Sequence, residues 1–191
     1  MGRLFVGLVH YPIYNKRMDV IAGAVTNFDI HDIARTCRTY DVERYYLIHP
    51  LDVQRQIIEK IVGYWQNGYG RVYNPDRSDA LDIVCYAASI EEAADDVKRI
   101  TGQQPYIVTT DARTYPNTVS YSFMRSKLEE GERPVLLLFG TGFGIEAETM
   151  KKFDYILEPV YGSGSYNHLC VRSAAAIILD RLAGEAWWQK Q

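Results

Sequence analysis

Short apolar runs alternate with segments of helical spacing along this chain, and this alternation constrains the fold more than any other feature. Six runs have the length and apolar content of buried strands: Leu4–Val9, Tyr45–Ile48, Ile83–Ala87, Tyr106–Val108, Val135–Phe139 and Tyr155–Leu157. Alternating strands and helices are typical of a mostly parallel sheet. We therefore predict an α/β fold in which a mostly parallel six-stranded sheet is covered by helices on both faces.

Two intervening segments carry helix boundary signals. Residues 28–40 repeat apolar side chains at helical spacing and follow Asn27 or Asp29, either of which suits an N-cap. Residues 90–100 follow Ser89, open with an acidic turn and end before a glycine, as a helix with a left-handed C-cap would. Both segments are therefore expected to be helices.

Size and composition favour one ordinary globular domain. A chain of 191 residues with 47% hydrophobic residues can bury a sizeable core, so we expect a single domain over residues 1–191. Its apolar runs fall far short of the roughly 20 residues that a membrane span needs. The start, Met1–Val9, is predicted to be a first strand and not a signal peptide. We expect a cytoplasmic protein without membrane contact.

The cysteines and the net charge narrow the choice of partners. Cys37, Cys85 and Cys170 are odd in number and widely spaced in apolar contexts, which favours reduced, buried thiols over disulfides or a metal cluster. The formal net charge is -3, with lysine and arginine scattered along the chain. Any contact with a nucleic acid must therefore come from a local patch.

A first glycine-rich segment, Leu136–Glu146, runs from an apolar strand into FGTGFG and then into a short predicted helix. Its backbone amides can approach a ligand closely, although such a cluster also suits a mere tight turn. A nucleoside triphosphate fits poorly, because no Lys-Ser or Lys-Thr pair follows and Glu146 is acidic. A dinucleotide is the stronger rival, since Glu158 ends the next strand, but Ile145 stands where that motif needs a third glycine.

A second cluster follows the last predicted strand. The strand ends at Pro159, a loop with Gly162 and Gly164 comes next, and an apolar helix is expected from near Asn167 to about Leu182. In a parallel sheet, glycine loops at the carboxyl ends of neighbouring strands line one crevice. The two clusters therefore predict a shared ligand site.

These segments resemble the motifs of the SPOUT class of RNA methyltransferases. FGTGFG is similar to the second motif of that class, PVYGSGSYNHLCVRSAAAIILDR to the third and TNFDIHDIARTCRTY to the first, and the whole chain looks like the TrmD-like branch. The resemblance implies methyl transfer from S-adenosylmethionine (SAM) to RNA, either tRNA or rRNA. It also implies a C-terminal trefoil knot and a homodimer built around the last helix.

By position, the resemblance places the cofactor in three loops after the fourth, fifth and sixth predicted strands. SAM has no phosphate, so backbone donors and small residues suit it better than a cationic clamp. Asn167 could instead cap a helix, and His168 could either orient a substrate or pack at the helix start. The implied contacts are Thr109, Thr110, Phe139, Gly140, Thr141, Gly142, Pro159, Val160, Gly162, Asn167, His168, Leu169 and Ser173.

The first motif also supplies candidate catalytic residues. Asn27 and Arg35 match, by type and rough spacing, an Asn and an Arg that face the methyl-transfer site in related enzymes. Arg35 would hold a phosphate or lower the pKa of an attacking group, because an arginine is not an ordinary base. It shares a helix side with His31 and Arg38, a strip that could also be a solvated face. Asp111, in a strand-end loop, is our candidate general base, with a turn-forming role as the alternative.

Residues 63–77 interleave Tyr64, Trp65, Tyr69 and Tyr73 with two arginines in a long, turn-rich stretch. Such a mixture suits stacking on unpaired bases, although aromatic loop residues also pack onto their own domain. The ending, residues 186–188, suits either a dimer contact or a surface tail. No separate RNA-binding domain is visible, so RNA capture could use the second subunit or an accessory partner.

Three functions follow from these patterns. The leading hypothesis is a SAM-dependent RNA methyltransferase that acts as a homodimer. The second is a non-catalytic RNA-binding module with the same fold, and the third is a dinucleotide-dependent oxidoreductase. Cofactor binding and methyl transfer to RNA discriminate among them.

Overall fold

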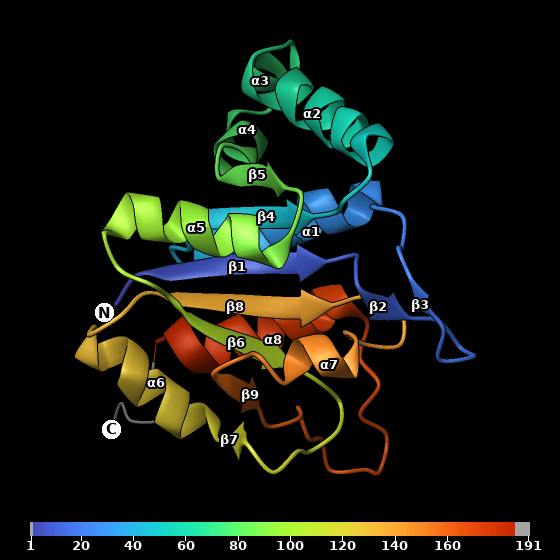
Figure 1. The fold of residues 1–191 in the computed structure, drawn as a ribbon. Helices are drawn as coiled ribbons and strands as arrows, with labels where there is room; N and C mark the ends of the chain where they lie inside the picture. Colours follow the sequence, from blue (N-terminus) through green and yellow to red (C-terminus); the bar gives the residue numbers. More distant parts are fainter. Residues whose placement is uncertain (1, 186–191) are drawn as a thin grey trace.

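The computed structural model describes residues 2–185, which form one parallel sheet of seven strands in the order β5-β4-β1-β8-β6-β9-β7 (Figure 1). A separate antiparallel hairpin pairs β2 with β3. The main strands are β1 (Leu4–Val9), β4 (Arg44–Ile48), β5 (Val84–Ala87), β6 (Tyr106–Thr110), β7 (Thr118–Val119), β8 (Val135–Gly140) and β9 (Tyr155–Leu157), and the hairpin joins β2 (Ile13–Tyr14) to β3 (Val20–Ile21).

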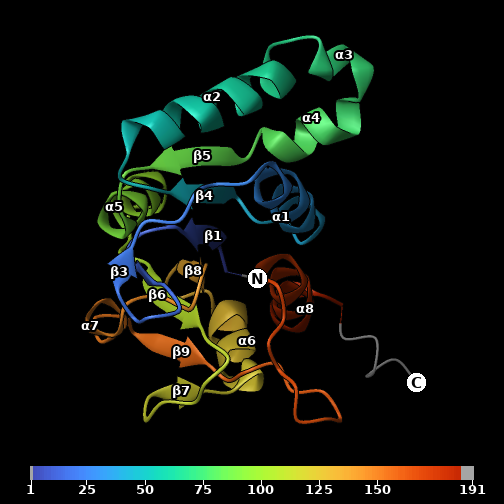
Figure 2. The ribbon, with the colours of Figure 1, turned by 90° about the vertical axis from the view of Figure 1, so that its right-hand side faces the viewer.

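Helices cover both faces of the sheet, as predicted. α5 and α7 lie on one face and α1, α6 and α8 on the other, while α2, α3 and α4 stand beyond the edge strand β5 (Figure 2). The helices are α1 (Asn27–Thr39), α2 (Asp52–Gln66), α3 (Gly70–Tyr73), α4 (Pro75–Leu81), α5 (Ile90–Thr101), α6 (Tyr121–Glu130), α7 (Ala147–Met150) and α8 (Val171–Ala183).

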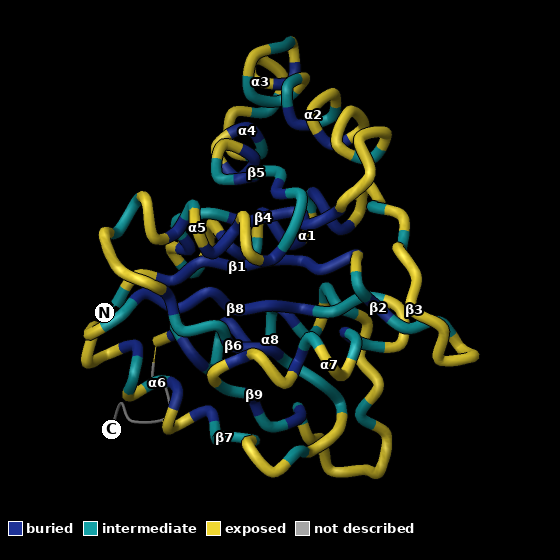
Figure 3. Tube along the Cα trace, viewed as in Figure 1, coloured by how far each residue is buried: buried dark blue, intermediate teal, exposed yellow. Residues whose placement is uncertain are grey.

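The core lies on either side of the two central strands. Every residue of β1 is buried, and in β8 only Gly140 is not (Figure 3). Side chains of a strand alternate between the two faces, so a strand covered on both faces is apolar throughout. The continuous apolar runs in the sequence follow from this double burial.

All six predicted strands are present, but the count of six is wrong. The seventh strand, β7, has two residues and pairs only with β9 at the edge of the sheet. A strand this short, with half-buried side chains, leaves no periodic signal in the sequence. The trefoil knot stays a prediction.

Several predicted boundaries need correction. α1 is capped by Thr26, whose hydroxyl accepts from the backbone N–H of Asp29, so neither Asn27 nor Asp29 is the N-cap. α5 begins after Ser89, as expected. α8 begins at Val171, so Asn167 lies before it and caps no helix.

The stretch from 63 to 78 is helical and not a loop. It contains the end of α2, all of α3 and the start of α4, joined by tight corners. α3 and α4 have only four and seven residues, too few to show a helical period, and only the last turn of α2 falls in this stretch.

Two further expectations concern the thiols and membrane contact. Cys37 is buried, and burial raises the pKa of its thiol, but Cys170 is exposed, so the expectation of buried thiols fails there. Within residues 2–185, no helix is long and apolar enough to cross a bilayer. The tail with Trp187 and Trp188 lies outside the described residues.

Candidate functional site

Three loops that the sequence assigned to the cofactor leave the same edge of the sheet. They follow β6, β8 and β9, which are hydrogen-bonded neighbours, so their carboxyl ends lie together. The side-chain amide of Asn167 donates to the carbonyl of Ala112 at 2.8 Å and thereby ties the last loop to the first. These strands lie on one side of β1, and β4 and β5 lie on the other, so the strand order reverses its direction at β1. Open α/β sheets bind ligands at the carboxyl ends of the strands near such a switch point.

The FGTGFG loop after β8 is packed against the β2–β3 hairpin. The Tyr14 N–H donates to the Gly144 carbonyl at 2.9 Å, and the Phe143 N–H donates to the Tyr14 carbonyl at 3.0 Å. Gly142 has φ +60°, and a Cβ there would lie 2.9 Å from the Tyr14 oxygen. Gly142 is therefore required by the chain's own packing.

The loop after β9 is open in contrast. Residues 161–166 are all exposed, and a Cβ at Gly162 or Gly164 would meet no heavy atom within 4 Å. No lysine or arginine occurs from Glu158 to Val171. An open loop of this kind fits SAM, whose sulfonium is positive and which carries no phosphate for a cation to hold. The Arg113 guanidinium of the first loop lies beside Gly144 and is paired with Asp111.

The other expected cofactor residues divide by burial. Thr109, Phe139 and Pro159 are buried, so they shape the strand ends and can meet a ligand only through their backbones. Gly140 and Val160 are half-buried, as are Thr110 and Thr141, whose hydroxyls bond strand carbonyls. The side chains of Leu169, Ser173 and His168 are exposed. The His168 ring lies edge-on to the ring of Tyr166.

The carboxylate of Asp111 organises its own loop. It accepts from the backbone N–H of Arg113 at 2.8 Å, from the Arg113 guanidinium at 3.0 and 3.1 Å, and from the Tyr115 hydroxyl at 3.1 Å. Its side chain is 6% exposed. A carboxylate with both oxygens so occupied suits the turn-forming role better than that of a general base.

The basic strip predicted on α1 is reduced to one cation. Arg38 pairs with Asp79 at 2.7 Å, and the His31 ring packs edge-on to Trp65 at a centroid distance of 5.5 Å. Arg35 is exposed and borders a hollow of about 350 Å³ between α1 and α8. Asn27, the first residue of α1, is also exposed.

Arg172, which the sequence analysis missed, joins the first motif to the start of α8. Its guanidinium lies 3.4 Å from Asp29 and 3.4 Å from Asp32, and 5.5 Å from the ring centroid of Phe28. These partners belong to α1, far away in the chain. No local pattern could have indicated them.

His10 was also missed. It follows the central strand β1, is buried, and neither ring nitrogen has a hydrogen-bond partner among the described residues. Burial lowers the pKa of His10 to about 4, so the ring is neutral near pH 7.

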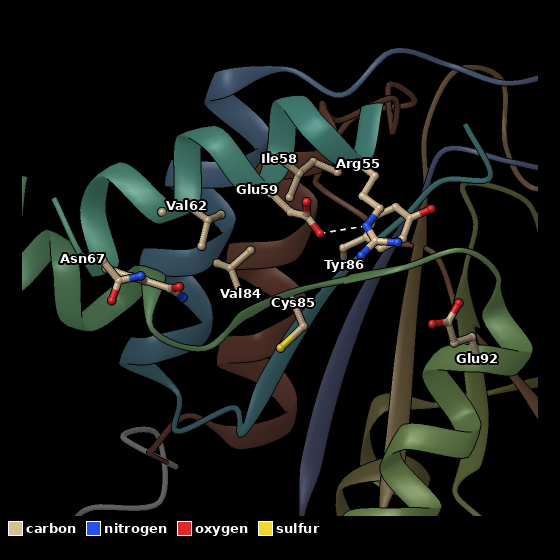
Figure 4. Close-up of a pocket in the computed structure, with 11 residues that line it drawn as sticks. Arg55, Ile58, Glu59, Val62, Asn67, Val84, Cys85, Tyr86 and Glu92 are labelled. Atoms are coloured by element: carbon tan, nitrogen blue, oxygen red, sulfur yellow. Dashed lines mark hydrogen bonds and ion pairs between the residues drawn. The ribbon is translucent and has the colours of Figure 1, made fainter. Parts of the chain in front are cut away.

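A second hollow, of about 500 Å³, lies between α2 and the edge strand β5 (Figure 4). The guanidinium of Arg55 and the carboxylate of Glu59 face each other there at 2.7 Å. No residue of the three strand-end loops lines this hollow. The loops, which Asn167 ties together, therefore remain the candidate ligand site, and this hollow is separate from them.

The structure removes the main support for a dinucleotide. The carboxylate of Glu158, which had the position of a ribose-binding acid, accepts from the backbone N–H of Tyr121 at 3.0 Å. It is therefore engaged with the first turn of α6.

Comparison with known sequences identifies the family. The profile of a family described as SAM-dependent RNA methyltransferase matches residues 3–184. An uncharacterized protein of Aquifex aeolicus is 46% identical over 94% of this chain and 87% of its own length. Proteins named tRNA (guanine-N(1)-)-methyltransferase from Oleidesulfovibrio alaskensis and Nitratidesulfovibrio vulgaris are 42% and 43% identical over 96% of this chain. The chain spans only 42% and 43% of their lengths.

Solved structures share the fold. A probable methylase family protein from Haemophilus influenzae superposes with a TM-score of 0.64 at 15% identity, covering 95% of this chain and 64% of that one. The SpoU methyltransferase AviRb from Streptomyces viridochromogenes, solved with AdoMet, gives 0.57 at 16% identity over 95% of this chain and 57% of its own. The profile match over nearly the whole chain, on a fold with three converging strand-end loops, leads to one conclusion: this chain belongs to the family of SAM-dependent RNA methyltransferases.

Proposed function

We propose that residues 1–191 act as one domain that methylates tRNA. The observation that carries this proposal is the family match over a chain whose three candidate cofactor loops leave neighbouring strands, the last of them open and tied to the first by Asn167. Two relatives that are more than 40% identical are named as tRNA methyltransferases, which favours tRNA over rRNA as the substrate. An accessory RNA-binding partner would help to hold the tRNA.

The residues that would hold the cofactor belong to the open loop and its neighbours. The backbone of Gly162 and Val160 would face the ligand, with Leu169 packing beside it and Ser173 offering a hydroxyl at the start of α8. Thr110 and Gly140 would complete the floor from the adjacent strand ends. When bound, SAM supplies an electrophilic methyl group on a positive sulfonium.

Arg35 would act on the substrate. A guanidinium suits the binding of phosphate, so Arg35 would hold a phosphate or lower the pKa of the attacking group. Asn27 would orient the same nucleotide from the start of α1. The engaged carboxylate of Asp111 would act by holding its loop.

We further propose a homodimer in which two copies meet at α1 and α8, and a trefoil knot through the cofactor loops. The hollow beside Arg35 lies between these helices, so the second copy would close it. The expected light-scattering mass is twice that of the 21.9 kDa chain, and a monomer at micromolar concentration would contradict the dimer.

The central test measures binding and transfer separately. Isothermal titration should show that SAM and its demethylated product bind, and tritiated SAM should label unmodified tRNA but not rRNA. Arg35→Ala should abolish labelling while the affinity for SAM is kept. Arg38→Ala, one turn away and already paired with Asp79, is the matched control and should label normally.

The outcomes separate the alternatives. Absence of SAM binding would overturn the proposal. Binding without labelling of any RNA would indicate the non-catalytic module, and labelling of rRNA alone would correct the substrate.

A further inference from the structure

The outermost turn of the molecule, α3, presents a compact aromatic surface. Tyr69, Val72 and Tyr73 are 67%, 77% and 71% exposed. The two tyrosine rings lie one helical turn apart, with centroids 6.3 Å apart and planes inclined by 32°. Contiguous apolar groups at a protein surface mark an interaction site, whereas single ones do not.

The turn between α2 and α3 is closely packed. A Cβ at Gly68 would lie 2.6 Å from the Tyr64 carbonyl oxygen, and one at Gly70 would lie 2.7 Å from the Trp65 ring. The Arg71 guanidinium donates to the Gln66 carbonyl at 2.9 Å. α3 is therefore seated on the end of α2, and the backbone that carries the two tyrosines is held in place.

Trp65 connects this surface to α1. The His31 ring meets it edge-on at 5.5 Å, the Arg77 guanidinium lies 5.0 Å from its centroid, and Arg35 lies one turn after His31. We call the six residues Arg35, His31, Trp65, Arg77, Tyr69 and Tyr73 the aromatic strip. It combines two arginines with four aromatic rings, carried by α1, α2, α4 and the turn of α3, whose positions in the fold Figures 1 and 2 show.

We infer that the aromatic strip binds a single-stranded segment of the RNA substrate, with Tyr69 and Tyr73 stacking on unpaired bases. This inference rests on the proposed function. Rings that stack on bases, interleaved with arginines that face phosphates, are the recurring means of holding single strands. The nearby Asp79 carboxylate is paired with Arg38, while Asp76 and Asp82 remain as opposing charges at the two ends of α4.

The test uses a fluorescein-labelled oligouridine of about 12 nucleotides as the probe, because stacking tolerates any base sequence. Fluorescence anisotropy measures the affinity of the protein for this probe. The double substitution Tyr69→Ala/Tyr73→Ala should weaken that affinity about tenfold or more. Tyr69→Phe/Tyr73→Phe keeps the rings and should bind like the unaltered protein. Leu51→Ala/Val53→Ala removes another exposed apolar pair, at the far end of α2, and should also have no effect.

A second measurement covers the case in which the alanine variant fails to fold. Ultraviolet crosslinking of a 4-thiouridine oligonucleotide to the unaltered protein should map to Tyr69 or Tyr73. Crosslinks confined to other segments would overturn the inference, as would an unchanged affinity of the alanine variant. A changed oligomeric state with unchanged RNA affinity would assign the surface to a protein contact and overturn it too.

Failure of this inference is distinguishable from failure of the proposed function. A protein that binds SAM and methylates tRNA with equal efficiency after both tyrosines are removed contradicts the strip alone. A protein that binds oligouridine through the tyrosines but does not bind SAM contradicts the methyltransferase proposal alone.

Discussion

Replacing Gly142 with alanine should destabilise the protein by about 2–4 kcal/mol, because two costs add. The left-handed conformation at φ +60° costs an alanine roughly 1–2 kcal/mol. The new Cβ would lie 2.9 Å from the Tyr14 oxygen, so the hairpin must move. This movement weakens the two hydrogen bonds between Tyr14 and the loop, each contributing about 1 kcal/mol.

Gly162→Ala is the matched control, from the other glycine loop. A Cβ there meets no heavy atom within 4 Å, so stability should stay within about 0.5 kcal/mol of the original value. The added methyl group nevertheless stands where we propose that the cofactor approaches. The affinity for SAM should therefore fall in this variant.

Urea unfolding followed by circular dichroism measures the stabilities, and isothermal titration measures the affinity for SAM. In a thermal scan the Gly142 variant should melt roughly 5–15 °C lower, given about 2–4 °C per kcal/mol at this chain length. Equal stability of Gly142→Ala and the unaltered protein would refute the packing argument. A Gly162→Ala variant that loses stability but binds SAM normally would refute the division between the loops.

Three further predictions follow from individual side chains. The pKa of His10 is about 4 in the folded state and lies near 6.5 unfolded, so the unfolded chain takes up the proton first and stability falls as pH drops from 6.5 to 4. In His10→Leu, the free energy of unfolding from urea titrations should fall less steeply with pH, by up to about 1.4 kcal/mol per pH unit. The same pH dependence of stability in the variant and the unaltered protein would contradict this. Asp111→Asn should lower the methylation rate less than about tenfold, whereas a loss of about a hundredfold or more would restore Asp111 as the general base. Arg172→Ala leaves the buried Asp29 without its cation and should cost about 1–2 kcal/mol in urea unfolding; an unchanged midpoint would show that the ion pair contributes nothing.

The sequence predicted the elements whose environment repeats along them. β1 and β8 could be predicted because burial on both faces makes nearly every position apolar. α5 could be predicted because its serine cap and terminal glycine are local signals. β7 was invisible, since two half-buried residues carry no period. The stretch from 63 to 78 was taken for a turn-rich loop, because α3 and α4 are too short to show a helical period.

The candidate site shows the same division. The sequence located the three loops because a glycine cluster after an apolar run is a local feature. It did not reveal which glycine serves the chain's own packing, because that depends on Tyr14, which belongs to a different segment. Arg38 looked free in the sequence and is paired with Asp79, and Arg172 gave no signal at all.

By itself, then, the sequence determined the alternation of strands and helices and the two glycine segments. The tertiary structure decided the partners: Asn167 with Ala112, Glu158 with Tyr121, and Trp65 with His31. The physical reason is that periodicity records how deeply a segment is buried, whereas a hydrogen bond or ring contact between distant segments depends on packing that no local pattern encodes.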